Sequence, residues 1–326
     1  PNKTKPTCNN NFFHNFIFFT LVKTISIVEY LYTMSISRQN LTIVIVTFKS
    51  EEVIHQCIQS IDSEIKIIII ENSNNIQFKE ELENKYVNVS CLLTSKNLGM
   101  GAGNNIGIKK AKTDFVLILN PDVILETSTI NELINAAQKN SNFAIIAPTS
   151  SDVNYPNYKL LDSQKSIAEF KCPLKVKSVD GFAMLFNKKK LDMIISNNYF
   201  DENFFMYLEN DDLCKRITEI NEDILIIPNS KIKHLGGKGV NEKLKDEIEL
   251  SRNWHWIWSK FYFNQKHYGY SKAFLEGLPK FLSSLIKYLF YLLIKNKIKK
   301  EKYLNRAAGF FNAAKNKPSW YRPDND

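Results

Sequence analysis

Short apolar runs rich in β-branched residues recur through the first half of the chain, and stretches with helical spacing of apolar positions separate them. We expect strands at Leu41–Val46, Ile67–Ile70, Val89–Leu93, Phe115–Leu119 and Phe143–Ala147. Strands separated by helices imply a parallel sheet with right-handed crossovers. The pattern therefore predicts an α/β fold, Rossmann-like, with a mostly parallel central sheet flanked by helices.

The stretches between these runs have the spacing of helices. Apolar residues recur at helical intervals over residues 53–61, and residues 107–111 form the end of a second short helix. Thr129 and Glu132 have the spacing of a capping box, which predicts a further helix through Ala137.

Composition is typical of an ordinary folded protein. The 326 residues are enough for one large core or two modest ones, since a domain takes roughly 100 to 200 residues. Charged residues make up 24% and aromatic residues 12%, which excludes disorder, collagen and a coiled coil. The cysteines are odd in number, widely scattered and without a CxxC pair: Cys8, Cys57, Cys91, Cys172 and Cys214. We interpret them as reduced core thiols in a cytosolic compartment.

Residues 1–38 precede the regular pattern and are expected to be an N-terminal extension. Met34 is followed by a polar segment that leads straight into the first strand, so we expect residues 1–33 to lie upstream of the natural start. The apolar patch Phe12–Val22 is interrupted by His14 and Asn15, and the stretch falls short of the ~20 apolar residues that span a bilayer.

The C-terminal region, residues 261–326, differs in character from the domain predicted for residues 39–260. Leu278–Ile294 predicts a strongly apolar helix, which is marginal in length for spanning a membrane and ample for lying in its interface. Lysines follow directly, at Lys295, Lys297, Lys299, Lys300 and Lys302. Apolar burial and attraction to anionic lipid add together, so we expect a helical, basic, membrane-associating region. A core-packing helix with a solvated basic tail is the alternative.

Ligands of parallel sheets bind beyond the carboxyl ends of the strands, a rule that selects Thr47, Glu71, Asn97 and Asp122. Asn120-Pro121-Asp122 places one carboxylate directly after a wholly apolar strand. A hard divalent cation takes oxygen ligands and needs only one or two protein carboxylates when phosphate and water supply the rest. Asn-Pro-Asp is also a good turn sequence, so a plain turn stays open at this point.

A glycine-rich run, NLGMGAGNNIG at residues 97–107, would let the backbone approach a phosphate or a sugar closely at the start of a helix. The glycine spacing does not fit the dinucleotide fingerprint GxGxxG, because the run does not follow the first strand and no acidic residue about twenty positions further on fits that fingerprint. We therefore expect a binding loop of another kind.

Seven blocks follow one another in order between Leu41 and Trp258. They are TIVIVTFKS (42–50), IIIIENS (67–73), NLGMGAGNNIGI (97–108), LILNPDV (117–123), DGFAMLF (180–186), FDENFFMYLENDDLCKR (200–216) and KHLGG (233–237). Together they resemble the family 2 glycosyltransferases of the rhamnosyltransferase-like branch, and seven ordered blocks are far more specific than any one. The resemblance implies a GT-A fold, a UDP- or dTDP-linked donor, a divalent metal such as Mg²⁺ or Mn²⁺, and inversion at the anomeric carbon.

The resemblance also assigns donor-side residues by position. Thr47 and Glu71 would contact the nucleotide, with Glu71 in place of the more usual aspartate. Further residues would line the donor site, namely Asn97, Gly99, Asn104 and Asn120. Asp122 would bind the metal as the Asn-Pro-Asp version of the family's DXD motif. His234 follows a strand-like segment and precedes two glycines, and the match favours it as a second metal ligand.

The segment ENDDLCKR at residues 209–216 matches the family's Glu-Asp-x-Asp-Leu-x-x-Arg, except that asparagine stands at position 210. Asparagine cannot act as a base, so we assign the catalytic base to Glu209, a carboxylate at the start of a helix. Asp212 and Arg216 are four residues apart and within ion-pair reach, and we expect them to support that helix. Asp180 is predicted to bind the acceptor, although a simple turn is equally consistent with its sequence.

These observations and the resemblance predict an inverting, metal-dependent glycosyltransferase that acts on a saccharide acceptor. By analogy, we expect the acceptor to be lipid-linked and the reaction to belong to bacterial cell-surface polysaccharide synthesis. By the same analogy we expect a cytoplasmic protein, peripheral at the inner face of the cell membrane. The alternative is a non-catalytic, membrane-associated protein that binds nucleotide sugars, because of Asn210. A nucleotidyltransferase would need a basic, glycine-rich loop after the first strand, and residues 47–50 do not resemble one. Nucleic-acid binding is disfavoured because no nucleic-acid-binding module is recognisable.

Overall fold

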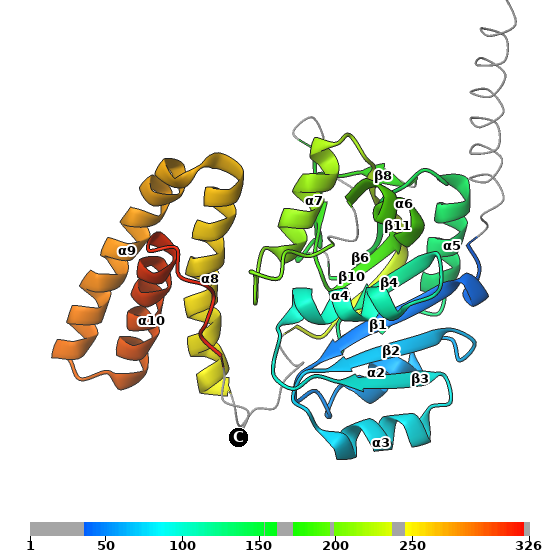
Figure 1. Cartoon of the computed structure of the whole chain (residues 1–326), viewed down its shortest axis with the longest axis horizontal. Helices are drawn as coiled ribbons and strands as arrows, with labels where there is room; N and C mark the ends of the chain where they lie inside the picture. Colours follow the sequence, from blue (N-terminus) through cyan, green and yellow to red (C-terminus); the bar gives the residue numbers. More distant parts are fainter. Residues whose placement is uncertain (1–35, 153, 162–171, 196–198, 237–244, 323–326) are drawn as a thin grey trace, which may run out of the picture.

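The computed structural model describes residues 36–152, 154–161, 172–195, 199–236 and 245–322. Within them, a mixed α/β domain extends to the end of β11, and three long helices form a second unit beside it (Figure 1). Most of the predicted N-terminal extension lies outside the described residues, as does Gly237 of the KHLGG block.

In the described part of the chain, nine strands form the central sheet in the order β3-β2-β1-β4-β10-β6-β11-β5, with β8 beside β11. Their bounds are β1 Leu41–Thr47, β2 Lys66–Glu71, β3 Val89–Leu93, β4 Phe115–Leu119, β5 Val123–Leu125, β6 Ile145–Ser150, β8 Leu174–Lys175, β10 Ala183–Asn187 and β11 Ile224–His234. Neighbours among β1, β2, β3 and β4 pair in parallel, as do β6 and β11. β10 is antiparallel to both β4 and β6. The predicted α/β class with a mostly parallel central sheet and a C-terminal helical extension is confirmed.

The five predicted strands are all present, as β1, β2, β3, β4 and β6. β6 begins two residues later than expected, at Ile145. The sequence pattern did not predict β10, whose residues lie mostly in the DGFAMLF block. A separate small sheet pairs β7 Tyr158–Lys159 with β9 Ser178–Val179.

Helices of the α/β domain cover both faces of the sheet. They are η1 Arg38–Asn40, α2 Ile54–Gln59, α3 Ile76–Lys85, α4 Met100–Lys110, α5 Thr129–Lys139, α6 Lys188–Ile195 and α7 Glu209–Glu219. Apolar residues of α2, α3 and α5 join one core cluster, and those of α4, α6 and α7 join the other. Along β1, Ile43 and Ile45 face the first cluster and Val44 faces the second, which explains why this strand is apolar at every position.

The predicted capping box at the start of α5 is wrong. Ser128 is the N-cap residue, and its side chain makes no capping hydrogen bond. The hydroxyl of Thr129 donates instead to the backbone carbonyl of Lys231 on β11. A tertiary contact to a neighbouring strand has therefore taken the hydrogen bond that local spacing suggested.

The glycine-rich run is mainly helix and not loop, which corrects the expectation for residues 97–107. Gly99 is the N-cap of α4, and the other glycines lie inside the helix. A Cβ at Gly103 would lie 2.8 Å from Val46 Cγ1, and one at Gly107 would lie 2.3 Å from Val44 Cγ1. These glycines let α4 approach β1 more closely than any side chain would permit.

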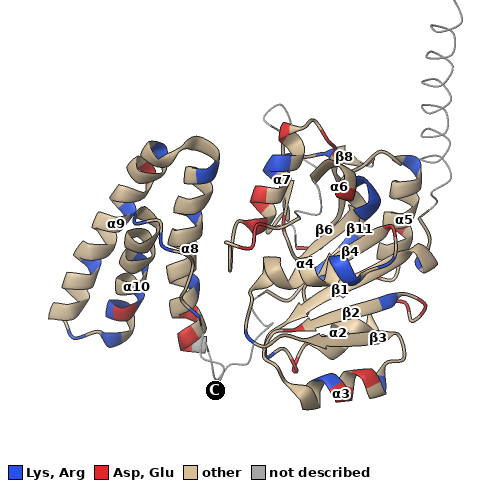
Figure 2. Ribbon diagram, viewed as in Figure 1, with Lys and Arg blue, Asp and Glu red and all other residues tan. Residues whose placement is uncertain are grey.

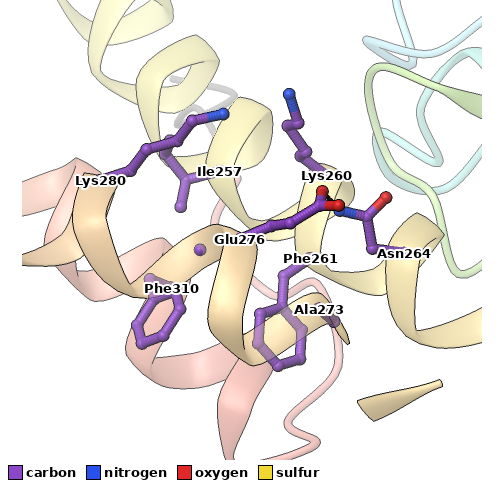
Figure 3. Close-up of a pocket in the computed structure, with 9 residues that line it drawn as sticks. Ile257, Lys260, Phe261, Asn264, Ala273, Glu276, Lys280 and Phe310 are labelled. Atoms are coloured by element: carbon purple, nitrogen blue, oxygen red, sulfur yellow. Dashed lines mark hydrogen bonds between the residues drawn. The ribbon is translucent and has the colours of Figure 1, made fainter. Parts of the chain in front are cut away.

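The C-terminal unit consists of α8 Lys245–Tyr268, α9 Tyr270–Leu293 and α10 Lys297–Ala314. The predicted domain boundary between residues 260 and 261 falls inside α8 and is therefore misplaced. Trp254 and Trp258 belong with Phe261 and Phe310 in a separate apolar cluster of this unit, so the whole of α8 packs with α9 and α10. A pocket between these helices is lined by residues that include Lys260, Asn264, Glu276 and Lys280 (Figure 3).

The close contact between α4 and β1 can be tested by adding one methyl group. We expect Gly107→Ala to lower the free energy of unfolding by about 1–3 kcal/mol, because overpacking against Val44 outweighs the better helix propensity of alanine. Urea unfolding would measure the change, with Lys110→Ala on the exposed side of α4 as the control. Adding Val44→Ala should recover part of the loss, and an unchanged stability in Gly107→Ala would contradict the packing argument.

Candidate active site

Several predicted site residues lie at one edge of the sheet. Thr47 ends β1, Glu71 ends β2, Asp122 follows β4 and His234 ends β11. These four strands run in the same direction, so their carboxyl ends lie at the same edge. This edge is where sheets of this class bind ligands.

The side chains of Asp122 and His234 lie close together, as the family resemblance suggested. His234 Nε2 lies 3.4 Å from Asp122 Oδ1, and the two side chains are 26% and 6% exposed. The backbone N–H of Leu235 donates to the Asp122 carbonyl at 2.9 Å, which ties the turn after β4 to the end of β11. The ring of Phe182 stacks on the imidazole with centroids 4.2 Å apart. Both side chains are thus oriented by neighbouring backbone and ring contacts.

The residues around this pair fit a divalent cation. Asn120 Oδ1 is buried and has no hydrogen-bond partner among the described residues, two positions before Asp122. One carboxylate oxygen, one imidazole nitrogen and one amide oxygen are ligand types that Mg²⁺ or Mn²⁺ accepts. Within the described residues, no group of three or more His, Cys, Asp or Glu side chains gathers into a metal site. A cation here would therefore need oxygens from a diphosphate or from water.

Glu209 is the first residue of α7 and carries the carboxylate predicted to act as a base. Its Oε2 atom is buried and has no hydrogen-bond partner among the described residues. Burial raises the pKa of Glu209 to about 7, with a backbone hydrogen bond lowering it and the charge of Asp211 raising it further. A carboxylate with a pKa near neutrality is suited to exchange a proton with a hydroxyl group.

The start of α4 packs directly on the segment that leads to Glu209. Gly99 has φ +84°, and a Cβ there would lie 2.3 Å from the carbonyl oxygen of Phe205. A Cβ on Gly101 would lie 3.6 Å from the Cβ of Glu209. Asn105 both accepts from the backbone N–H of Phe200 and donates to its carbonyl, at 3.0 and 2.9 Å. The glycine-rich helix therefore forms one wall of the Glu209 site.

Asn210 has a structural role that an ionised aspartate could not perform. Its Nδ2 donates to the backbone carbonyl of Val179 at 2.9 Å. A Cβ on Gly181 would lie 3.3 Å from the Cβ of Asn210, so these two segments are in close contact. An ionised carboxylate has no proton to donate and would face that carbonyl with two acceptors. The amide therefore joins the start of α7 to the segment that ends β9.

Asp180, the predicted acceptor residue, lies within electrostatic reach of both halves of the site. Burial raises the pKa of its carboxyl, and the charge of Asp211 raises it further. The positive charge of Lys159, and that of His234 when its imidazole is protonated, lowers the pKa of Asp180. Asp180 is thus close enough to sense the base-bearing helix as well as the Asp122–His234 pair.

Glu71 and Thr47 already have partners within the protein. The Glu71 carboxylate accepts from the backbone N–H of Ser73 and of Asn75 and from the Ser73 hydroxyl, which closes the turn after β2. The Thr47 hydroxyl contacts the Ile70 carbonyl at 3.5 Å. Both side chains are fully buried, so their contact with a nucleotide stays a prediction.

The other donor-side candidates surround the N-terminus of α4. Asn97 Oδ1 accepts from the backbone N–H of Gly99 at 3.0 Å, and Asn72 Nδ2 donates to the Gly99 carbonyl at 3.2 Å. Asn104 is buried in the first turns of the same helix. These bonds give the start of α4 a fixed shape, which is what a sugar or phosphate site requires, and the donor contacts themselves stay predicted.

Comparison with known proteins identifies the α/β part of the chain. Residues 42–195 match the model of glycosyl transferase family 2. Residues 42–195, from β1 to α6, carry the similarity to family 2 glycosyltransferases. Two curated relatives are a low-salt glycan biosynthesis hexosyltransferase, Agl10 of Haloferax volcanii, and the rhamnosyltransferase WbbL of Escherichia coli. Their names agree with the rhamnosyltransferase-like branch that the sequence blocks suggested.

The similarity to these relatives is partial. Agl10 is 26% identical over 203 residues, which cover 57% of this chain and 64% of that protein. WbbL is 24% identical over 202 residues, which cover 54% of this chain and 76% of that protein. The match thus spans less than two thirds of the length of Agl10.

Two solved structures resemble the model of this chain. A structure of GalNAc-T7 with UDP, GalNAc and Mn²⁺ has a TM-score of 0.49 at 15% identity, covering 72% of this chain and 56% of that one. Residues 1–349 of Staphylococcus aureus TarS have a TM-score of 0.48 at 15% identity, covering 86% and 93%.

The predicted pair of Asp212 and Arg216 is confirmed, with Nε and Oδ2 at 2.9 Å. The sequence did not reveal that Lys266 and His267 of α8 also contact this carboxylate, at 2.7 and 2.8 Å from Oδ1. No local pattern links residues more than fifty positions apart. The complete burial of Asp212, which requires several partners, becomes visible only in the structure.

The raised pKa of Glu209 predicts a distinctive titration. In protein labelled with ¹³C at glutamate carboxyl groups, one carboxyl resonance should titrate near pH 7, because burial disfavours the ionised form. This resonance should be absent from the Glu209→Gln variant. If every glutamate titrates within about one unit of its usual pKa of roughly 4.3, the burial argument fails.

Proposed function

We propose that the chain is an inverting, metal-dependent glycosyltransferase that moves a hexose, rhamnose-like or other, from a UDP- or dTDP-sugar to a hydroxyl of a saccharide acceptor. The observation that carries the proposal is the Glu209 carboxylate, which has a buried unpaired oxygen and a pKa of about 7 and follows the segment 42–195 that matches family 2. The Asp122–His234 pair at the sheet edge supplies the second element that such a reaction needs.

The reaction is a single in-line displacement. Glu209 accepts the proton of the acceptor hydroxyl, and that oxygen forms a bond to the anomeric carbon as the bond from this carbon to the nucleotide diphosphate breaks. Attack from the face opposite the leaving group inverts the configuration. Asp122 and His234, with Asn120 beside them, would hold Mg²⁺ or Mn²⁺, which offsets the charge that develops on the departing diphosphate.

A non-catalytic nucleotide-sugar binding protein is the alternative, and it is favoured by Asn210 in the family's acidic motif. The hydrogen bond from Asn210 to Val179 gives this residue a structural reason of its own. Glu209, the first residue of α7, remains available as a carboxylate that could act as the base. The two candidates differ in whether any sugar is transferred.

A donor screen with UDP- and dTDP-sugars tests the proposal. With a donor and acceptor that support turnover, Glu209→Gln should lower kcat by about 10²–10⁴-fold with little change in donor KM, because the amide cannot take a proton. Wild-type kcat should fall as pH drops below about 7, where Glu209 becomes protonated. Asn210→Asp should not raise activity, because it loses the bond to Val179.

Nuclear magnetic resonance of the first product formed would establish the anomeric configuration. Full activity of Glu209→Gln would remove this residue from the mechanism, and retention of configuration would exclude a single displacement. Nucleotide binding without transfer to any acceptor would favour the binding protein.

The proposal includes a cytoplasmic location at the inner face of the cell membrane, where a lipid-linked acceptor would be held. The free cysteines among the described residues, Cys57, Cys91, Cys172 and Cys214, agree with a reducing compartment. No described helix is long and apolar enough to cross a bilayer. Our proposal assigns membrane association to a surface of the C-terminal unit.

An exposed apolar stripe on α9 supports docking to an anionic lipid surface. The stripe consists of Leu275, Leu282, Ile286, Leu289 and Leu293, whose side chains are 48–80% exposed. Intervals of seven, four, three and four residues place them on one side of the helix, away from the buried Ala273 and Ser284. Basic residues gather at the turn between α9 and α10 (Figure 2), where they would meet anionic headgroups.

Vesicle binding tests this surface. Full-length protein should bind vesicles containing phosphatidylglycerol, and Leu282→Glu/Ile286→Glu should weaken binding by at least about tenfold, because it places two charges in the apolar stripe. Ile76→Glu/Val87→Glu is a matched control, since it changes two exposed apolar residues of the α/β domain. Equal binding by both double variants would contradict the proposal. Loss of a dimer in the stripe variant, without vesicle binding by wild type, would assign the stripe to self-association.

A further inference from the structure

The segment from Asp201 to Leu208 leads into Glu209 and lies against one face of α8. Side chains of α8 that contact it, or contact Asp212 just beyond it, are Trp256, Ser259, Tyr262, Lys266 and His267. Their spacing of three, three, four and one residues places them along one side of the helix. We call these five residues the α8 brace.

The brace holds a strained piece of backbone. Tyr207 and Leu208 are consecutive non-glycine residues in the left-handed region, with φ of +70° and +68°. Such conformations are unfavourable for residues other than glycine and persist only when surrounding contacts hold them. The Ser259 hydroxyl donates to the carbonyl of Met206 at 2.7 Å, and Trp256 packs edge-to-face on Tyr207 with ring centroids 5.4 Å apart. Both contacts lie immediately before Glu209.

A second group of contacts is ionic and surrounds Asp212. This carboxylate is fully buried three residues after Glu209, and it contacts Arg216 of its own helix and Lys266 and the imidazole of His267 on α8. Lys266 Nζ lies 2.7 Å from both Asp212 Oδ1 and Asp201 Oδ2, so it joins the beginning of the segment to the first turn of α7. A buried carboxylate is strongly destabilising without such partners. The α7 start is therefore attached to α8 by charge as well as by packing.

The segment also packs on α4. A Cβ at Gly99 would lie 2.3 Å from the carbonyl oxygen of Phe205, and one at Gly101 would lie 3.6 Å from the Cβ of Glu209. Glu209 is thus held between α4, in the family 2 domain, and α8, in the C-terminal unit. If α8 were detached, Tyr207 and Leu208 could relax to ordinary backbone conformations. The carboxylate would then turn and become hydrated.

We propose that the α8 brace is a positioning surface for Glu209, so that the C-terminal helical unit forms part of the active site rather than only an attachment to it. The proposal rests on the proposed function, because it assigns Glu209 as the base. Its residues act through the α7 start and do not contact the reacting atoms. It therefore predicts a loss of turnover without a loss of donor binding.

Three full-length variants test the brace one contact at a time. Ser259→Ala removes one hydroxyl group, Lys266→Met removes the bridge between the two aspartates, and His267→Ala removes the imidazole that contacts Asp212. We expect kcat to fall by at least about tenfold in Lys266→Met and His267→Ala, with donor KM within about twofold of wild type. His267→Gln should recover most of the activity, because its amide N–H can donate to Asp212.

The matched control is Lys260→Met, the same substitution on α8 at a residue that lines the pocket between the helices (Figure 3). It should leave kcat unchanged. A further readout is the acid limb of the kcat profile, which should move from near pH 7 in wild type to lower pH in Lys266→Met, because a hydrated Glu209 is a stronger acid. A merely structural role would lower stability without moving this midpoint.

Hydrogen exchange distinguishes failure of the brace from failure of the proposed function. Amides of residues 204–212 should exchange faster in Lys266→Met and in Ser259→Ala, whereas those of β1 should be unchanged. If wild type transfers no sugar but exchange behaves as expected, the proposed function fails and the brace stands as a positioning contact for the segment. If exchange, kcat and the pH midpoint are all unchanged in Lys266→Met and Ser259→Ala, the brace is overturned.

Discussion

The start of α7 is held between α4 and α8, and the candidate base depends on that arrangement. On the α4 side, Gly99 and Gly101 present no side chains, so the backbone around Phe205 and Glu209 comes into direct contact with the helix. On the α8 side, the buried Asp212 carboxylate requires charged and hydrogen-bonding partners, and Lys266 and the imidazole of His267 are two of them. Tight packing on one side and charge neutralisation on the other leave the Glu209 carboxylate buried and directed by its surroundings.

The two carboxylates of the candidate site are in different environments, and the difference suits them to different tasks. Asp122 lies 3.4 Å from the imidazole of His234, near an unpaired amide oxygen of Asn120, which is an arrangement able to hold a cation. Glu209 has no such partner, and burial raises its pKa to about 7. Separate environments of this kind allow one site to combine an ionised ligand with a proton acceptor. Asp180, whose pKa responds to both Asp211 and His234, lies within reach of both.

Predictions from sequence succeeded where a pattern reports burial or position along one element. The runs that became β1 to β4 were found closely, because strands covered on both faces are apolar throughout. Asp122 was expected at the sheet edge because it follows a strand, and the family resemblance added His234 as a second metal ligand; the two side chains lie 3.4 Å apart. The glycine-rich loop and the capping box failed, because Gly107 and Thr129 serve contacts with Val44 and Lys231 on other elements.

The sequence by itself determined the apolar strands β1 to β4 and β6, the turn that carries Asp122 and the helix that begins at Glu209, since each depends on a pattern within a few consecutive residues. The tertiary structure alone decided that β10 enters the sheet antiparallel between β4 and β6, and that α8 belongs with the C-terminal unit and contacts the α7 start. An aromatic and basic C-terminal sequence is equally compatible with a lipid surface or a protein surface. Only folding showed which of its side chains meet the buried carboxylate of Asp212, because that choice depends on packing and charge neutralisation across more than fifty residues.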